Sequence, residues 1–194
     1  MARAYKRLGN DERRSRLLDL GQALFTQHTF DELSMARIAR EAGISKALLY
    51  HYFPSKRAYF LETLASGADE LRAAIEPDPD AEPLEALTSA VDVYLEWIDE
   101  HAESYRKLLQ SAAAIPEVRE VIEAVRADTT QRILDGLGAT SPQARATTSG
   151  WLWFVDGVCL DWLDHRDMTR DEVRDLVLGT LMMSLGAAGA LPAG

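Results

Sequence analysis

The sequence of 194 residues contains one cysteine, so it lacks the cysteines that stabilise secreted proteins through disulfides and many metal-dependent proteins through thiolate ligands. Cys159 can form no disulfide within the chain and no multi-thiolate metal site, which excludes zinc fingers, iron–sulfur clusters and disulfide scaffolds. The first residues, MARAYKRLGN, carry charge but lack the apolar core of a secretory signal. These absences predict a protein of the reducing cytoplasm.

The sequence also lacks the short motifs that mark common enzyme classes. It contains no phosphate-binding glycine loop, no HExxH pair and no serine elbow. Cys159 lies in the apolar run VCL, which favours a buried, inert thiol over a nucleophile. We therefore predict no catalytic residue, no metal site, no cofactor and no enzymatic activity.

Residues 176–194 form a run of 19 residues without charge, the one segment that raises the question of a membrane span. A run of that length could cross a bilayer. It contains four glycines and Pro192, and no charged anchor follows it. This composition suits close packing of helices better than a bilayer span, so no membrane partner is predicted.

Acidic residues are scarce in the first part of the chain and basic residues are scarce in the rest. The net charge of -10 hides this division. Residues 1–57 contain 11 of the 21 Lys and Arg but 6 of the 31 Asp and Glu, a balance of +5. The remaining residues contain 10 basic and 25 acidic groups, a balance of -15. A basic segment on an acidic body predicts that one end binds a polyanion.

Hydrophobic periodicity predicts helices throughout and no strand of useful length, so the fold class is all-α with about nine helices. Ser34, Ser45 and Ser55 are suitable N-caps, and Gly43 suits the left-handed residue after a helix. Further boundaries are predicted at Pro83, Pro116, His101 to Ser104, Gly136, Gly138, Ser141 with Pro142, and the capping box of Thr169 and Glu172.

The clearest break in the chain is EPDPDAEP, residues 76–83, which has three prolines and no side chain able to build a core. We place an N-terminal domain at residues 11–71 and a C-terminal helical domain at residues 84–190. In the helix after Ser55, the spacing places Phe60, Leu64, Ala68, Leu71 and Ile75 on one stripe.

Two short helices joined by AGIS, residues 42–45, describe a helix-turn-helix unit. Ile38, Ala39, Ile44 and Leu49 occupy inward spacings in this unit. A helix of seven residues is about 10 Å long, so three or four side chains of its outer face can reach base edges in a major groove.

The run LSMARIAREAGISKALLYHYFPSKRAYFLETL, residues 33–64, resembles the DNA-binding segment of the tetracycline repressor (TetR) family of transcriptional regulators. Several features hold at fixed spacing, including Ile38-Ala39, Leu49-Tyr50, Tyr52-Phe53 and Lys56 three residues after Phe53. The resemblance covers about residues 11–71, and beyond it the helical layout agrees. It implies a DNA-binding regulator, commonly a repressor, that acts as a homodimer on a palindromic operator of double-stranded DNA.

The resemblance also implies roles for individual residues. Ser34, Tyr50 and Lys56 match positions that hold phosphates, and Ser45, Lys46, Ala47 and His51 match positions that read bases. Leu48 departs from the pattern, because many relatives carry a small or hydroxylated residue there. Two alternative interpretations stay open. In one, Lys56 is a solvated charge among many on the surface; in the other, His51 caps the end of its helix.

In this family the C-terminal helices form a pocket for a small-molecule effector, and the last two helices build the dimer interface. Gly150 and Gly157 in one of those helices, and Gly179 and Gly186 in the other, would allow close crossings; alternatively, each accommodates a bulky neighbour such as Trp151. The candidate pocket residues are the aromatic and histidine side chains Tyr94, Trp97, His101, Tyr105, Trp151, Phe154 and Trp162. A helical binding module without DNA and an architectural DNA binder without an effector are the alternatives.

Overall fold

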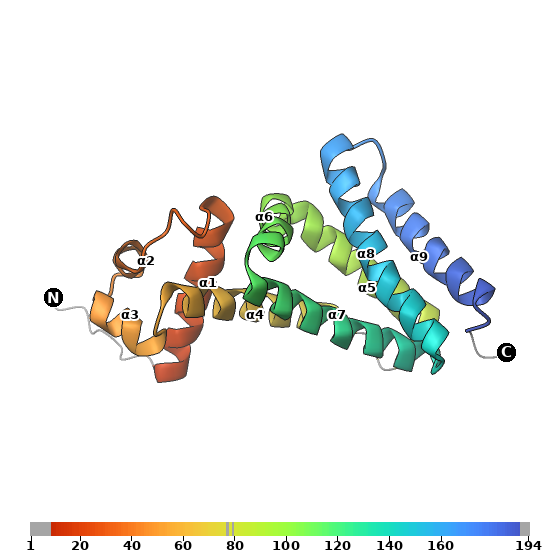
Figure 1. Cartoon of the computed structure of the whole chain (residues 1–194), viewed down its shortest axis with the longest axis horizontal. Coiled ribbons are helices and arrows are strands. Elements are labelled where there is room, and N and C mark those ends of the chain that lie inside the picture. The colour runs from red at the N-terminus through yellow and green to blue at the C-terminus, as the bar shows by residue number, and fades with distance from the viewer. Residues whose placement is uncertain (1–8, 77, 79, 191–194) are drawn as a thin grey trace. The chain divides into compact units, whose positions relative to one another are not determined.

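The computed structural model describes residues 9–76, 78 and 80–190. Within these residues the chain forms nine helices and no strand, which confirms the all-α prediction (Figure 1). The helices are α1 (Asn10–Gln27), α2 (Met35–Glu41), α3 (Lys46–Tyr52), α4 (Lys56–Ala74), α5 (Pro83–Glu100), α6 (Ala102–Ala114), α7 (Pro116–Leu137), α8 (Pro142–His165) and α9 (Arg170–Ala187). No helix in this part of the chain is long and apolar enough to cross a bilayer.

The chain divides into two compact units between Asp69 and Glu70, inside α4. The N-terminal unit contains α1, α2, α3 and most of α4. The C-terminal unit contains the end of α4 and α5 to α9. The predicted break at residues 76–83 lies between α4 and the start of α5.

Local signals set the helix ends of the N-terminal unit as predicted. The hydroxyl of Ser34 accepts from the backbone N–H of Arg37 at 3.2 Å, and Ser45 accepts from Leu48 at 3.1 Å. Gly43 has φ +65°, a left-handed conformation that L side chains adopt at a cost. These caps place α2 and α3 as two short helices around a tight turn.

The core of the N-terminal unit depends on a close approach of α1 and α4. A Cβ added at Gly21 would lie 2.4 Å from Thr63 Oγ1 and 2.8 Å from the Tyr59 hydroxyl. That hydroxyl donates to the carbonyl of Leu17 at 2.6 Å. The buried residues of α4 are Tyr59, Phe60 and Thr63. Along the predicted stripe Phe60 is buried, and Leu64, Ala68, Leu71 and Ile75 are partly buried.

Proline, serine and threonine set the helix starts of the C-terminal unit. Pro83, Pro116 and Pro142 occupy first turns, and Thr169 with Glu172 forms the predicted capping box. The interruption predicted near His101 falls on that residue, between α5 and α6. Helix α7 ends at Leu137 with Gly138 in the left-handed conformation, so Gly136 lies inside the helix and does not end it.

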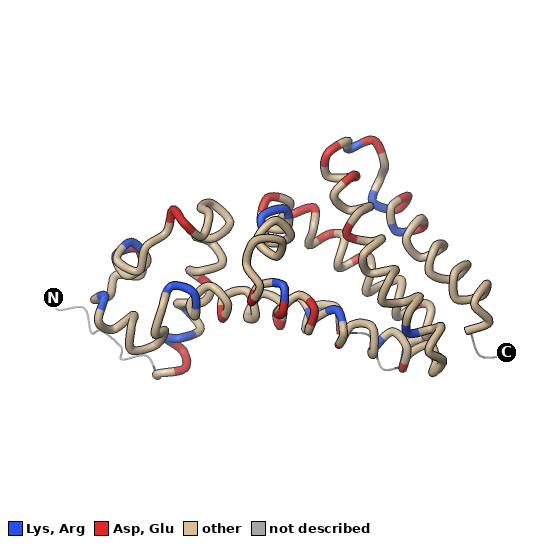
Figure 2. The backbone as a smooth tube through the Cα atoms, viewed as in Figure 1, with Lys and Arg blue, Asp and Glu red and all other residues tan. Residues whose placement is uncertain are grey.

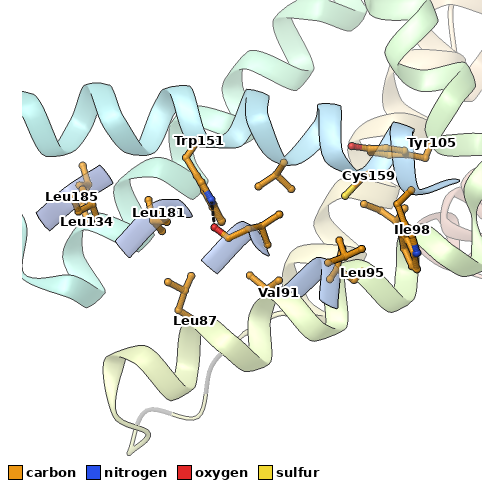
Figure 3. Packing of buried hydrophobic residues seen from close by; sticks show 14 of the residues in the cluster. Leu87, Val91, Leu95, Ile98, Tyr105, Leu134, Trp151, Cys159, Leu181 and Leu185 are labelled. Carbon is orange, nitrogen blue, oxygen red and sulfur yellow. Dashed lines mark hydrogen bonds between the residues drawn. The ribbon is translucent and has the colours of Figure 1, made fainter. Parts of the chain in front are cut away.

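The C-terminal unit is built around one hydrophobic cluster between α5, α8 and α9, with α6 and α7 packed against it (Figure 3). Leu95, Ile98, Leu181 and Leu185 are fully buried there. The indole N–H of Trp151 donates to the Val177 carbonyl at 2.7 Å, which joins α8 to α9. The polar atom of this large aromatic residue is therefore satisfied inside the core.

Candidate nucleic-acid interface

Helix α3 presents one buried side and one exposed side. Leu49 is fully buried and anchors the helix in the unit. The exposed residues of α3 and its cap are Ser45, Lys46, Ala47, Tyr50 and His51. The structure thus brings all four predicted base-reading positions and the predicted phosphate contact Tyr50 together on one surface.

Lys46 and Tyr50 lie one turn apart on this surface and contact each other. The Lys46 ammonium lies 5.7 Å from the centre of the Tyr50 ring, which is a cation–π arrangement. Tyr50 is 43% exposed, unusually high for a large aromatic side chain. An exposed ring beside a lysine gives a flat surface and several polar hydrogens that can meet a nucleic acid.

The two serines of the predicted site both serve as helix caps. Ser34 and Ser45 are exposed, and each hydroxyl oxygen accepts a backbone N–H of its own helix. Because the hydroxyl oxygen is the acceptor in each cap, its hydrogen remains able to donate. Each serine can therefore cap its helix and donate to an anionic oxygen at the same time.

Lys56 contacts carbonyls of its own chain. Its ammonium donates to the carbonyl of Phe30 at 2.9 Å and to that of Leu33 at 3.1 Å. It also lies 4.1 Å from the centre of the Phe30 ring. The side chain is partly buried and faces the connection between α1 and α2.

Arg40 is an exposed cation of this unit that the sequence reasoning left out. Its side chain is 72% exposed on the last turn of α2, beside Glu41 at 3.6 Å. Arg40 lies three positions before Gly43, and one basic residue at that place is a weak signal in the sequence, so its exposure is known only from the structure.

Three of the predicted pocket residues are packed as core. Tyr105, Trp151 and Trp162 are 3%, 6% and 3% exposed. The indole N–H of Trp162 donates to the Met168 carbonyl at 2.8 Å. With their polar atoms satisfied inside the protein, the two indoles have the geometry of ordinary core residues.

The other four predicted pocket residues occupy different surroundings. Trp97 and His101 stack on each other with ring centres 4.9 Å apart, and Tyr94 is partly buried near Tyr105. Phe154 is exposed, at 36%. The structure therefore brings Tyr94 and Tyr105 together and pairs Trp97 with His101, but it gathers no single ring of seven side chains.

A polar cluster that the sequence did not predict lies at Tyr105. The Tyr105 hydroxyl donates to Asp156 Oδ1 at 2.6 Å, and the Arg126 guanidinium pairs with Asp156 Oδ2. Arg126 also lies 3.7 Å from the centre of the Trp153 ring. The Arg126 and Asp156 side chains are 16% and 15% exposed, so this is a largely desolvated ion pair. An acid inside the apolar run FVDGVCL was the one signal in the sequence for it.

Burial keeps the neighbouring hydroxyls and the thiol protonated. Burial raises the pKa of Tyr105 and Tyr94 far above the ordinary value, and the negative charge of Asp156 acts in the same direction. Burial also raises the pKa of Cys159 to about 12, with Asp156 again contributing. Cys159 is fully buried, which confirms the predicted buried position of the thiol.

A row of ion pairs joins α5 to the end of α8 and to α9. Arg174 lies 3.2 Å from Asp92, Arg170 lies 3.3 Å from Glu96, and Arg166 lies 2.5 Å from Asp99. Acidic and basic residues are also interleaved along α7 and around the turn between α8 and α9 (Figure 2). Arginines of the C-terminal unit are thus largely matched by carboxylates.

The outer face of α8 and α9 carries glycine and exposed apolar residues. A Cβ added at Gly150, Gly157, Gly179 or Gly186 meets no described atom within 4 Å. No described neighbour in this chain requires glycine at these positions. Leu176 and Met183 of α9 are 42% and 71% exposed.

Comparisons with known families match both halves of the chain. Residues 17–63 match "Bacterial regulatory proteins, tetR family". Residues 83–184 match "Tetracyclin repressor-like, C-terminal domain". The second match alone covers more than half of the chain.

The chain is also similar to regulators from mycobacteria. It is 26% identical over 196 residues to the HTH-type transcriptional activator FasR of Mycolicibacterium smegmatis, covering 96% of this chain and 87% of the relative. It is 30% identical over 118 residues to the HTH-type transcriptional regulator EthR of the same organism, covering 59% and 54%. Among solved structures, a tetR-family transcriptional regulator from Streptomyces coelicolor superposes with a TM-score of 0.81 at 26% identity, covering 94% of this chain and 84% of that one.

Proposed function

The chain belongs to the TetR family of bacterial transcriptional regulators, and on that premise we propose that it is a repressor. It binds a palindromic operator as a homodimer and leaves the operator when a small-molecule effector binds. A regulator of this kind works where the chromosome lies, which places it in the cytoplasm. It has no catalytic role.

The observation that carries the DNA-binding role is the exposed face of α3. A helix of this length presents three or four side chains to a major groove, and Lys46, Ala47 and His51 are exposed together after Ser45. Lys46 is the residue proposed to donate to guanine O6 or N7. Ala47 offers apolar contact to a thymine methyl group.

Phosphate contacts fix the register of this helix on the duplex. We assign Ser34 and Tyr50 to this role, because both are exposed and both carry a hydroxyl hydrogen. Lys56 matches a third phosphate position of the family, and its ammonium contacts the carbonyls of Phe30 and Leu33. Arg40 adds a positive charge to the same unit.

The homodimer is proposed to form through the outer faces of α8 and α9. Glycine at four positions where no described neighbour needs it leaves helix backbones open to close approach. The exposed side chains of Leu176 and Met183 would lose water in such a contact. A two-fold axis there presents two copies of α3, which read half-sites about 34 Å apart on one side of the duplex.

The effector is proposed to bind in the C-terminal unit near Tyr94, Tyr105 and Arg126. The Tyr105 hydroxyl donates to Asp156 while Arg126 pairs with the same carboxylate, so a polar ligand group can take the place of the neutral hydroxyl while Arg126 keeps the charge of Asp156 paired. A ligand that binds the DNA-incompetent state better by about 1 to 3 kcal/mol weakens operator binding roughly 5- to 150-fold.

The packing of Tyr105, Trp151 and Trp162 as core favours a second candidate, an architectural DNA binder without an effector. The two candidates differ in one measurement. A compound that raises the thermal unfolding midpoint of the full chain and releases DNA supports the effector, whereas DNA binding that no stabilising compound releases supports the architectural role.

Selection of bound duplexes from a random library by the full-length protein tests the proposed function. We expect a palindromic consensus, because a two-fold dimer reads the same bases twice. Lys46→Ala should then change the preferred base at one position of each half-site, at a cost of about 1 to 3 kcal/mol. Recovery of no consensus, or equal weakening on every duplex, would contradict base reading by α3.

Gly179→Leu tests the dimer. A leucine side chain would force the outer faces apart, so sedimentation should give the mass of a monomer and operator binding should fall with it. Gly136→Ala is the matched control, because Gly136 is an exposed helical glycine of α7 with no described atom within 4 Å of an added Cβ. A dimer that still forms in Gly179→Leu rejects this interface.

A further inference from the structure

The connection between α1 and α2, residues 28–34, is held in place by side chains from two helices, α4 and α2. Lys56, the first residue of α4, donates to the carbonyls of Phe30 and Leu33. Arg37 of α2 lies 2.8 Å from Nε2 of His28, which follows the end of α1. The connection leads directly to Ser34, the cap of α2.

The Lys56 contacts provide hydrogen-bond donors to two main-chain carbonyls of this connection. The two carbonyls lie in a segment outside any helix, and Leu33 itself is only 1% exposed. Buried main-chain carbonyls need hydrogen-bond donors. An ammonium has three donors and no acceptor, so it can serve both carbonyls at once.

Phe30 makes the same arrangement specific for a cation. The Lys56 ammonium lies 4.1 Å from the Phe30 ring centre, and that ring packs 5.2 Å from the ring of Phe60. Phe60 belongs to the core of the N-terminal unit. The positive charge therefore lies against an aromatic face that is fixed in the core, where cation–π attraction is stronger than at an open surface.

We propose that Lys56 is a positioning residue. It fixes residues 28–34 and thereby the start of α2, so that Ser34 meets the DNA phosphate in the correct place. This proposal rests on the DNA-binding function proposed above, and it differs from the direct phosphate contact that the family resemblance implies for Lys56. Two of the three ammonium hydrogens point to the protein's own carbonyls rather than to solvent.

Lys56→Met in the full-length chain tests the proposal, since it keeps the aliphatic stem and removes the donors. Without DNA, hydrogen exchange of the backbone amides of residues 28–37 should become at least about tenfold faster, because the connection loses the hydrogen bonds that Lys56 donates to it. Unchanged exchange in this segment would overturn the clamp. This readout does not depend on DNA binding, so it separates failure of the clamp from failure of the proposed function.

Titration of a labelled duplex of mixed sequence over a range of salt concentrations gives the second readout. A positioning residue should weaken binding at every salt concentration while the slope of log K against log salt stays within about 0.3 of the wild-type slope. Loss of a direct phosphate contact should reduce the slope by about 0.9. Arg40→Met is the matched control, because it removes one exposed charge from the same unit without touching residues 28–34.

A double-mutant cycle with Ser34→Gly distinguishes positioning from general destabilisation. Glycine keeps most of the capping function but lacks the hydroxyl that would meet a phosphate. If Lys56 acts through Ser34, the two substitutions together should weaken binding little more than either alone. Additive losses would mean independent phosphate contacts and would overturn the proposal.

Lys56→Arg keeps the test decisive if Lys56→Met fails to fold. The planar guanidinium keeps the charge and is an excellent phosphate ligand, but it is larger than the compact ammonium and holds its donors in a rigid plane, so we expect it to fit less well between the two carbonyls. Positioning predicts faster exchange at residues 28–37 and weaker binding in this variant. Wild-type exchange and binding would instead assign Lys56 to the DNA backbone.

Discussion

The two units of this chain use their basic residues in opposite ways. In the N-terminal unit Lys46 lies on the exposed ring of Tyr50, and the Arg40 side chain is 72% exposed. In the C-terminal unit Arg166, Arg170 and Arg174 each pair with a carboxylate of α5. Lys46 and Arg40 lie on exposed surface, although Arg40 is 3.6 Å from the neighbouring Glu41, whereas the three arginines pair with carboxylates of another helix.

The buried polar groups differ in the same way. In the N-terminal unit the Tyr59 hydroxyl donates to the main-chain carbonyl of Leu17. In the C-terminal unit the Tyr105 hydroxyl donates to Asp156, whose charge is balanced by Arg126. The first arrangement depends on helix geometry alone, whereas the second depends on a pair of charges that other charged or polar groups can perturb.

Arg126→Met should have the largest effect on this comparison. Removing one partner leaves Asp156 largely buried without its counter-charge, and such losses cost about 3 to 5 kcal/mol of unfolding free energy. Urea unfolding followed by far-UV circular dichroism measures the change, and hydrogen exchange should locate it in the C-terminal unit.

The double variant Arg126→Met with Asp156→Asn is the control for that experiment. Asparagine is neutral and still accepts the Tyr105 hydroxyl, so most of the lost stability should return. A double variant as unstable as Arg126→Met would show that the charge imbalance is not the cause.

Gly21→Ala should disturb the other unit, by about 1 to 3 kcal/mol, because an added methyl overpacks the crossing of α1 and α4. Thr63 and Tyr59 lie too close to give way without losing the hydrogen bond to Leu17. The thermal unfolding midpoint and DNA affinity should both fall.

Gly67→Ala is the matched control within α4. An added Cβ there lies 3.7 Å from the Gln22 side chain, an ordinary contact. Alanine also favours helix over glycine by about 1 kcal/mol, so this variant should be at least as stable as the wild type. Equal destabilisation by both substitutions would exclude overpacking at Gly21.

Alkaline pH should weaken the C-terminal unit through Cys159. The folded thiol has its pKa raised to about 12 by burial, whereas an exposed thiol ionises near about 8.5. Above about pH 9 the unfolded chain releases this proton and the folded chain keeps it, so stability falls by up to about 1.4 kcal/mol per pH unit.

Cys159→Ala removes this group and should flatten the dependence of unfolding free energy on pH between about pH 9 and 10. The tyrosines Tyr94 and Tyr105 act in the same direction, but an unfolded tyrosine ionises only near about pH 10. An unchanged pH dependence in Cys159→Ala would show that the thiol is not protected by folding.

Arg170→Ala should have the smallest effect. Arg170 and Glu96 are 44% and 57% exposed, and exposed pairs contribute roughly 0 to 1 kcal/mol. The difference from wild type in urea unfolding should shrink further at high salt, where exposed charges are screened. A loss as large as that of Arg126→Met would mean that the whole row of ion pairs acts as one unit.

The helix caps could be predicted because each depends on residues close in sequence. Ser34 and Ser45 lie three positions before the N–H groups that they accept, and Thr169 with Glu172 forms a complete motif. The exposed face of α3 followed from the same local spacing. All-α architecture and the helix-turn-helix unit were therefore predictable from sequence alone.

Contacts between distant residues could not be predicted. Nothing near Gly21 indicates that Thr63 will lie against it, and Tyr105, Arg126 and Asp156 come from three different helices. Lys56 has a familiar motif position, but its hydrogen bonds reach residues more than twenty positions away. Whether these side chains bind DNA or an effector stays a prediction.

All four tryptophans of the chain, Trp97, Trp151, Trp153 and Trp162, lie in the C-terminal unit. The N-terminal unit is therefore optically silent when light excites indole but not phenol. Two indoles are buried and hydrogen-bonded to carbonyls, while Trp153 is 59% exposed beside Arg126. A change in emission wavelength or intensity when DNA is added would thus report a conformational change that reaches the C-terminal unit, with no label attached.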